Sequence, residues 1–116
     1  MTLDEFKNYC LAKPDVTESY PMKGEAVWMK ANGKLFAIAN VRDMKMEGVM
    51  VAPFHFINLK CDPDRAMALR EQYDVIRPGW HQNKTHWNSV FVGEGISDDL
   101  LRDLIDHSYD LVTGKK

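Results

Sequence analysis

Residues 77–92 concentrate the side chains of this sequence that could bind another molecule. The stretch reads Arg-Pro-Gly-Trp-His-Gln-Asn-Lys-Thr-His-Trp-Asn-Ser-Val-Phe-Val, and it holds two of the three tryptophans and two of the four histidines but no carboxylate. Arginine and lysine can contact phosphates, amides can reach base edges, and tryptophan and histidine can stack on an unpaired base. The stretch therefore indicates a nucleic-acid surface. The residues expected to form it are Arg77, Trp80, His81, Asn83, Lys84 and His86.

A second interpretation of the same stretch is structural. Asn, Pro and Gly at this density often fix the shape of a turn. Asn83 and Lys84 would then brace the loop, and Trp87 would belong to the core. A separate functional alternative is an adaptor module that binds a protein or a small molecule through the same surface. A continuous positive face that includes Arg77 would favour nucleic acid, and a closed pocket around Trp80 would favour a small ligand.

The sequence does not indicate a catalytic site or a metal site. Ser89 lies in a strand pattern without the glycine elbow of a hydrolase nucleophile. Cys61 precedes a predicted helix, whose N-terminus can activate a thiol, but a small buried side chain is the simpler interpretation. His81 and His86 lack a third nearby ligand, so no metal is expected. Because no glycine-rich phosphate loop is present, we expect no NAD or NTP cofactor. With no catalytic, metal or cofactor site indicated, we expect a protein that is not an enzyme.

The composition is that of one globular domain spanning residues 1–116, with 45% hydrophobic and 28% charged residues. The formal net charge of −2 argues against tight non-specific binding to nucleic acid, which needs many phosphate contacts. The charge is uneven, because residues 21–92 carry ten Lys and Arg against seven Asp and Glu, whereas the rest carry five against ten. The middle of the chain is therefore mildly basic between acidic ends.

The two cysteines, Cys10 and Cys61, are far apart and show no metal-ligand spacing. We expect both to be free, buried thiols in a reducing compartment. No apolar stretch reaches membrane-spanning length, and no apolar run after a basic start indicates a signal peptide. A cytoplasmic protein without a membrane partner is therefore expected.

Local signals predict three helices. Each begins at a residue whose side chain can accept a hydrogen bond from an unpaired backbone N–H, and Glu5 completes a capping box in the first. The second is expected to pack through Ala66, Met67 and Leu69, and the third shows a regular apolar stripe. The capping residues are Thr2, Asp62 and Ser97, and the helices are expected to end at Pro14, near Tyr73 and at Gly114.

Strand patterns lie between these helices. Asn32-Gly33 indicates a tight hairpin turn, and alternation in the third strand places Phe54 and Phe56 on one face and His55 on the other. The element order α-β-β-β-α-β-α predicts an α+β fold, an antiparallel sheet with helices packed on one face. The predicted strands are residues 26–30, 34–41, 54–60 and 87–92, with 49–52 a candidate for one more.

Two connections are predicted to lack regular structure. Residues 15–24 are expected to be a linker and 42–48 a charged loop. The methionines of the second connection, Met44, Met46 and Met50, suit adaptable contacts. They indicate either a weak homodimer through this segment or a segment that folds back onto the sheet of a monomer.

Residues 81–90 read His-Gln-Asn-Lys-Thr-His-Trp-Asn-Ser-Val, which resembles the H-x-N-K-x-H-W-x-x-V signature of the MmcQ/YjbR family. The resemblance covers nearly the whole chain and implies a compact fold similar to that of frataxin, the CyaY-like fold. It also implies DNA binding through residues 77–92 and adjacent basic strands, whereas a non-enzymatic protein- or small-ligand-binding adaptor remains the alternative. One departure is the longer connection between residues 41 and 56. The other segments that agree are 33–37, 59–63, 77–79 and 106–112.

Four aspartates share one face of the last predicted helix. A face of this kind can bind a cation or a basic partner, and it resembles the acidic face of frataxin at the level of the fold. It can also be the solvated side of an amphipathic helix. The residues are Asp99, Asp103, Asp106 and Asp110.

Overall fold

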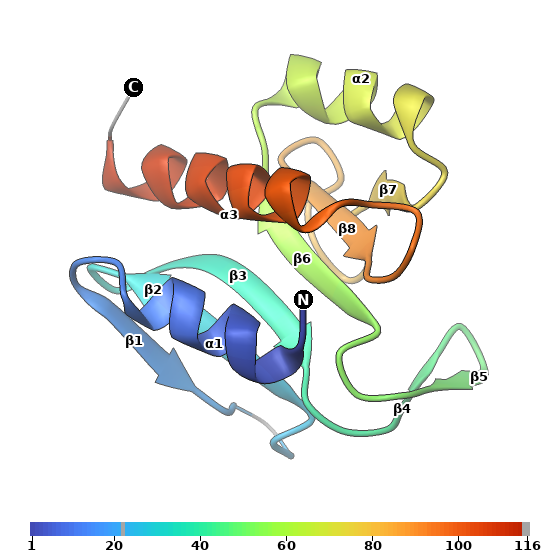
Figure 1. Ribbon diagram of the computed structural model, residues 1–116, viewed down its shortest axis with the longest axis horizontal. Helices are drawn as coiled ribbons and strands as arrows, with labels where there is room; N and C mark the ends of the chain where they lie inside the picture. The colour runs from blue at the N-terminus through green and yellow to red at the C-terminus, as the bar shows by residue number, and fades with distance from the viewer. Residues whose placement is uncertain (22, 115–116) are drawn as a thin grey trace.

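The computed structural model describes residues 1–21 and 23–114, and within this range the chain forms the predicted α+β fold. One six-stranded antiparallel sheet has the order β1-β2-β3-β6-β8-β7, and β4 and β5 form a separate hairpin. Figure 1 shows the three helices beside the sheet and the hairpin extending away from it. The elements are α1 (Leu3–Leu11), β1 (Val16–Ser19), β2 (Ala26–Ala31), β3 (Lys34–Asn40), β4 (Met44–Met46), β5 (Val49–Val51), β6 (Phe56–Lys60), α2 (Pro63–Gln72), β7 (Ile76–Pro78), β8 (Trp87–Phe91) and α3 (Asp98–Thr113).

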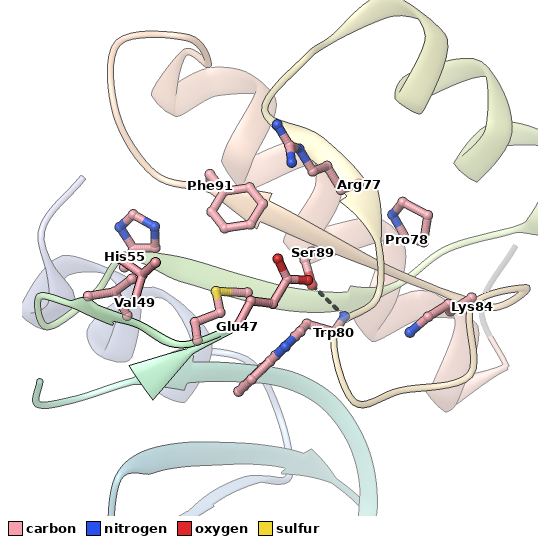
Figure 2. Close-up of a pocket in the computed structure, with 11 residues that line it drawn as sticks. Glu47, Val49, His55, Arg77, Pro78, Trp80, Lys84, Ser89 and Phe91 are labelled. Carbon is pink, nitrogen blue, oxygen red and sulfur yellow. Dashed lines mark hydrogen bonds between the residues drawn. The ribbon is translucent and has the colours of Figure 1, made fainter. Parts of the chain in front are cut away.

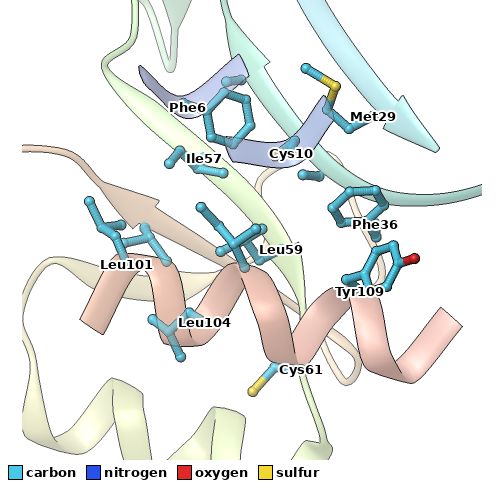
Figure 3. Close-up of a cluster of buried hydrophobic side chains, with 14 of the residues drawn as sticks. Phe6, Cys10, Met29, Phe36, Ile57, Leu59, Cys61, Leu101, Leu104 and Tyr109 are labelled. Atoms are coloured by element: carbon cyan, nitrogen blue, oxygen red, sulfur yellow. The ribbon is translucent and has the colours of Figure 1, made fainter. Parts of the chain in front are cut away.

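The helices cover one face of the sheet, as the sequence predicts. Val27, Ala39, Ile57 and Val90 lie side by side across four strands, and none is more than 1% exposed. Figure 3 shows the helix side chains that pack on this face, from α1 and α3. Burying this apolar surface is the main term that stabilises the fold. The other face of the sheet is left for the hairpin and the loop after β7.

The capping residues act as predicted. The Thr2 hydroxyl accepts a hydrogen bond from the Glu5 N–H at 3.1 Å, and the Glu5 carboxylate accepts one from the Thr2 N–H at 2.8 Å. The side chains of Asp62 and Ser97 accept hydrogen bonds from the N–H groups of Arg65 and Leu100 and so cap α2 and α3, without a reciprocal bond. Gly114 ends α3 in the left-handed conformation, which glycine adopts without steric cost.

The prediction that α2 packs through Met67 is wrong. Ala66 and Leu69 are buried, but Met67 is 60% exposed. Residues three apart share a helix face, whereas the residue after Ala66 is turned about 100° away from it. The second helix therefore contacts the core along a narrow line.

Three of the four aspartates on the acidic face of α3 are paired. The Asp106 carboxylate lies 2.5 Å from Lys13 Nζ and accepts a hydrogen bond from the Tyr9 hydroxyl at 2.7 Å, which ties α1 to α3. Asp103 pairs with Arg65 at 2.5 Å, and Asp99 pairs with Arg102 on the same helix. These contacts favour the structural interpretation of the acidic face.

Residues 15–24, predicted to be a linker, contain an edge strand. β1 pairs with β2 in an antiparallel arrangement from Val16↔Ala31 to Ser19↔Trp28. Thr17, Glu18 and Ser19 are all exposed, so this strand has no alternation of apolar and polar residues. The sequence therefore does not predict it. Asp15 turns the chain into β1 with a φ of 62°.

The connection between β3 and β6 also differs from its prediction. Residues 44–46, predicted to be part of a loop, form β4 and pair with β5, whose strand character at 49–51 is confirmed. The strand predicted to begin at Phe54 begins at Phe56, because Phe54 has a φ of 57°. This left-handed residue reverses the alternation, so Phe54 packs on Phe6 of α1 at 5.5 Å while His55 and Phe56 lie on the opposite side of the sheet.

The described part of the chain contains no helix that combines the length and the apolar character needed to cross a membrane.

Candidate functional site

A hollow of about 590 Å³ lies on the sheet face that the helices leave uncovered. Its floor is formed by β7 and β8, one wall by the loop that follows β7, and the opposite wall by the β4–β5 hairpin (Figure 2). This volume is in the range of small-molecule sites. The lining residues are Met46, Glu47, Val49, Val51, His55, Arg77, Pro78, Trp80, Lys84, Ser89 and Phe91.

Two buried polar residues fix the position of Trp80. Ser89 and Asn58 face each other on β8 and β6, and the Ser89 hydroxyl donates to Asn58 Oδ1 at 2.5 Å. The same hydroxyl accepts from the Trp80 N–H at 2.8 Å, and Asn58 Nδ2 donates to the Trp80 carbonyl at 3.0 Å. Because Ser89 and Asn58 are 1% and 2% exposed, this closed network works in a medium where hydrogen bonds are strong.

The Trp80 ring forms one aromatic wall of the hollow. It meets Phe56 edge to face with ring centres 5.7 Å apart, and His81 stacks on it at 3.8 Å with 15° between the ring planes. His81 reaches this position with a φ of 58°. Trp80 is half-buried and His81 is exposed, so the stacked pair stands at the edge of the site.

The loop that carries Trp80 is braced from inside. Lys84 Nζ donates to the Gly79 carbonyl at 2.8 Å, and Asn83 Oδ1 accepts from the N–H groups of Thr85 and His86 at 2.9 Å and 3.2 Å. These contacts agree with the structural interpretation of Asn83 and Lys84. The loop is therefore a rigid part of the wall.

The loop is also held from outside by α2. Arg70 of that helix donates to Asn88 Oδ1 at 2.7 Å and to the carbonyls of Lys84 and Trp87. A Cβ at Gly79 would lie 2.7 Å from Trp87 Cβ, so glycine is required where the loop leaves β7. Trp87 itself is 6% exposed, which confirms its predicted place in the core.

The opposite end of the hollow combines a cation with two rings. The Arg77 guanidinium lies 5.8 Å from the centre of the Phe91 ring, and its Nε donates to the Asp74 carbonyl at 3.4 Å. His55 meets Phe91 edge to face at 5.4 Å. The sequence predicts Arg77 at this site, but it does not predict Phe91 or His55.

The hairpin contributes the carboxylate that the stretch 77–92 lacks. Glu47 and Gly48 form its turn, with φ values of 52° and 81°, and the Glu47 side chain points from there across the hollow (Figure 2). In the described part of the chain, Glu47 has no ion-pair or hydrogen-bond partner. The sequence gives no signal for this residue, because it comes from a connection thirty positions before Arg77.

Asn40 fixes the base of the hairpin. It is fully buried, its Nδ2 donates to the Ala52 carbonyl at 2.7 Å, and its Oδ1 accepts from the His55 N–H at 2.8 Å and the Phe56 N–H at 3.3 Å. One side chain thus holds the segment that follows the hairpin. These hydrogen bonds fix the base of the hairpin, which forms one wall of the hollow.

The six predicted site residues do not form one surface. Arg77, Trp80 and Lys84 line the hollow. His81 stacks on the Trp80 ring, and the Asn83 side chain accepts hydrogen bonds from backbone groups of its own loop. His86 lies elsewhere, in a smaller hollow of about 210 Å³ that also includes Lys60 and Cys61. The prediction that these residues bind DNA is not tested by this arrangement.

The cysteines and histidines are dispersed. Burial raises the pKa of Cys10 to about 12 and that of Cys61 to about 11, so neither thiol is activated in the way that a reactive cysteine requires. Within residues 1–21 and 23–114, no three His, Cys, Asp or Glu side chains are grouped so that they could hold a metal ion.

The pattern of the whole sequence identifies its relatives. The family model named YjbR matches residues 11–111. The chain belongs to the YjbR family. It is 41% identical over 106 residues to the Uncharacterized protein YbdF of Escherichia coli O157:H7, covering 91% of this chain and 80% of that protein. It is 32% identical over 109 residues to the Uncharacterized protein YjbR of Escherichia coli K12, covering 94% and 85%.

Solved structures similar to this YjbR-family chain have the same fold. The crystal structure of Deinococcus radiodurans protein DR2400, a DUF419 domain, has a TM-score of 0.82 and 28% identity, and the match covers 98% of this chain and 80% of that one. A crystal structure of a Pseudomonas syringae protein has a TM-score of 0.77 and 24% identity over 96% and 98%. The predicted family and fold are therefore confirmed.

Proposed function

We propose that this YjbR-family chain is a binding module that takes a small organic molecule in the hollow between the sheet and the β4–β5 hairpin. The observation that carries the proposal is the wall around Trp80, which the buried Asn58–Ser89 pair holds in place. Sites of this kind are concave and mostly apolar, with a few fixed polar groups. The hollow matches that description through Trp80, Phe91 and Val51.

The rigidity of the loop that follows β7 favours small-molecule binding over nucleic-acid recognition. Lys84 and Asn83 make hydrogen bonds within their loop, so the two groups expected to contact phosphate and base edges are already engaged. A ligand that enters a wall fixed in advance loses less conformational entropy on binding than one that must order it.

A screen of small fragments by two-dimensional amide NMR tests the proposal. Ligands should shift the signals of Trp80, Val51 and Phe91 together. Val49→Arg, which introduces a long side chain at the mouth, should weaken binding by at least about tenfold. Met50→Arg is the matched control, because Met50 is similarly exposed, at 59% against 63% for Val49, but does not line the hollow. Shifts scattered over the surface, or equal effects of the two variants, would contradict the proposal.

DNA binding in a reducing, cytoplasmic location is the second candidate, and one observation favours it. The Trp80–His81 stack at the rim of the site is a surface on which an unpaired base could continue the stacking. Arg77 and Lys84 would then contact phosphates, and Arg77→Gln or Lys84→Gln should reduce the salt slope of binding by about one. Lys45→Gln, on an exposed hairpin position, is the control. DNA binding should be rejected if single- and double-stranded DNA show no salt-dependent affinity at low ionic strength.

A further inference from the structure

Unlike charges face the same hollow without neutralising each other. Arg77 and Lys84 line it from the side of β7 and its loop, and Glu47 lines it from the hairpin. Among the described residues, none of these three side chains forms an ion pair. Charged groups held apart in a partly enclosed space can each be satisfied by a ligand of the opposite sign.

Arg77 lines the hollow and has unused hydrogen-bond donors. Its Nε donates to the Asp74 carbonyl, and its guanidinium carbon lies 5.8 Å from the centre of the Phe91 ring. Its two terminal nitrogens have no hydrogen-bond partner in the described part of the chain. A guanidinium fork matches a carboxylate with two parallel hydrogen bonds. Lys84, by contrast, is engaged with the Gly79 carbonyl of its own loop.

Glu47 requires the opposite kind of group. A carboxylate only accepts hydrogen bonds, and no described side chain donates to this one. Its turn conformation directs it inward from a wall that otherwise consists of Met46, Val49 and Val51. A protonated amine is the ligand group that satisfies such an acceptor with both charge and donors.

The space between these charges is aromatic and apolar. Trp80 and Phe91 present rings from two sides, and Pro78 and Val51 complete the surface. Flat aromatic groups gain from edge-to-face and offset contacts with rings arranged in this way. The body of the ligand should therefore be an aromatic ring.

We propose that the ligand of the hollow is a small aromatic zwitterion, whose carboxylate binds Arg77 and whose protonated amine binds Glu47. This inference rests on the proposed function, because it names the chemical class of molecule that the same hollow takes. It assigns Glu47 as the residue that selects for an amine and Arg77 as the residue that selects for a carboxylate.

Four matched probes test the class of ligand: L-phenylalanine, 3-phenylpropanoate, 2-phenylethylamine and 3-phenylpropanol. Titrations followed by amide NMR should give affinity for L-phenylalanine at least about tenfold above either singly charged probe, since each charged hydrogen bond contributes about that factor. Glu47→Gln should abolish the preference for L-phenylalanine over 3-phenylpropanoate. Arg77→Gln should abolish its preference over 2-phenylethylamine, and Lys45→Gln should change neither.

The outcomes separate this inference from the proposed function. Equal affinity for zwitterionic and singly charged probes, or fragment ligands that all lack one of the two charges, would overturn the zwitterion and leave the hollow as a binding site. If no probe and no fragment shifts the signals of the hollow, the proposed function itself is overturned.

Discussion

Asn58 and Ser89 are cross-strand neighbours that together satisfy both backbone polar groups of Trp80. Neither residue lies in the helix-covered core, although both are almost fully buried. Their contacts form a ring of three hydrogen bonds beneath the hollow. Side chains on the face of the sheet that the helices leave uncovered thus fix the position of Trp80 directly.

Ser89→Ala should destabilise the protein and loosen Trp80. The change leaves the Trp80 N–H and Asn58 Oδ1 without partners in a buried place, which costs about 1–3 kcal/mol. Urea denaturation measures the loss. Ser19→Ala, at an exposed position of β1, is the control and should stay within about 0.5 kcal/mol of wild type. A Ser89 variant as stable as the control would show that the ring is dispensable.

Trp87→Ala should cost about 3–5 kcal/mol, as for other large aromatic residues in protein cores. Trp87 is buried, and its carbonyl also accepts the Gly79 N–H at 2.9 Å. Thermal or urea denaturation measures the change, with Met67→Ala on the exposed side of α2 as the control. A Trp87 variant that melts like wild type would contradict the core assignment.

Stability should fall as the pH is lowered through the titration of His107. Burial, and then the charge of Arg65, lower the pKa of His107 below its ordinary value of 6.5, and the neutral Nε2 accepts the Asp62 N–H at 3.1 Å. Because the unfolded chain binds the proton more readily, this contribution is complete above pH 6.5 and is lost below it.

Urea denaturation between about pH 5 and pH 8 measures this dependence. His107→Gln should flatten the curve in that range, because the substituted side chain does not titrate. His81→Gln is the control, since His81 is exposed on the loop. An unchanged pH profile in the His107 variant would assign the effect to other groups.

Both thiols should react slowly in the folded protein. Burial raises the pKa of Cys10 and Cys61 to about 12 and about 11, so little thiolate is present near neutral pH. A colourimetric thiol reagent should label both only after denaturant is added. Melting temperature should be the same with and without reductant or chelator. Fast labelling of one thiol in the native state would restore the reactive interpretation of that cysteine.

Self-association, if it occurs, should depend on Met50. The three methionines of the hairpin segment have different surroundings: Met46 is 8% exposed and faces the hollow, whereas Met50 is 59% exposed. We propose a monomer that forms at most a weak homodimer through the hairpin. Sedimentation at several concentrations should detect any dimer, and Met50→Lys should abolish it while Met67→Lys does not. A dimer that both variants retain would exclude the hairpin contact.

The features predicted correctly from the sequence are those with local causes. The capping box at Thr2, the hairpin at Asn32-Gly33, with φ values of 52° and 78°, and the stop at Gly114 each depend on neighbouring residues. The burial of Trp87 was predictable because it opens a strand that continues into Val90, Phe91 and Val92. The family followed from a long motif that covers residues 81–90.

The features that were missed depend on tertiary structure. β1 is an edge strand with exposed side chains, so it carries no apolar alternation, and the left-handed Phe54 reverses a pattern that assumes continuous strand geometry. His55, just before β6, enters the hollow because β6 lies next to β8 in the sheet, whereas Glu47 enters it from the separate β4–β5 hairpin. Part of the lining of the site was therefore visible in residues 77–92, but the opposite wall was not. The predicted DNA contacts of that stretch stay a prediction.

The two outermost strands of the sheet limit how the protein can aggregate. β7 spans three residues and ends in Pro78, which has no N–H to donate to a further strand. At the other edge, β1 spans four residues, and its Glu18 lies 3.5 Å from Lys7 of α1. Short edges with proline and charge are the means by which β proteins discourage fibril-like growth. The aromatic hollow can therefore stay open to solvent, because the edges of the sheet offer few backbone groups with which a strand of another molecule could pair.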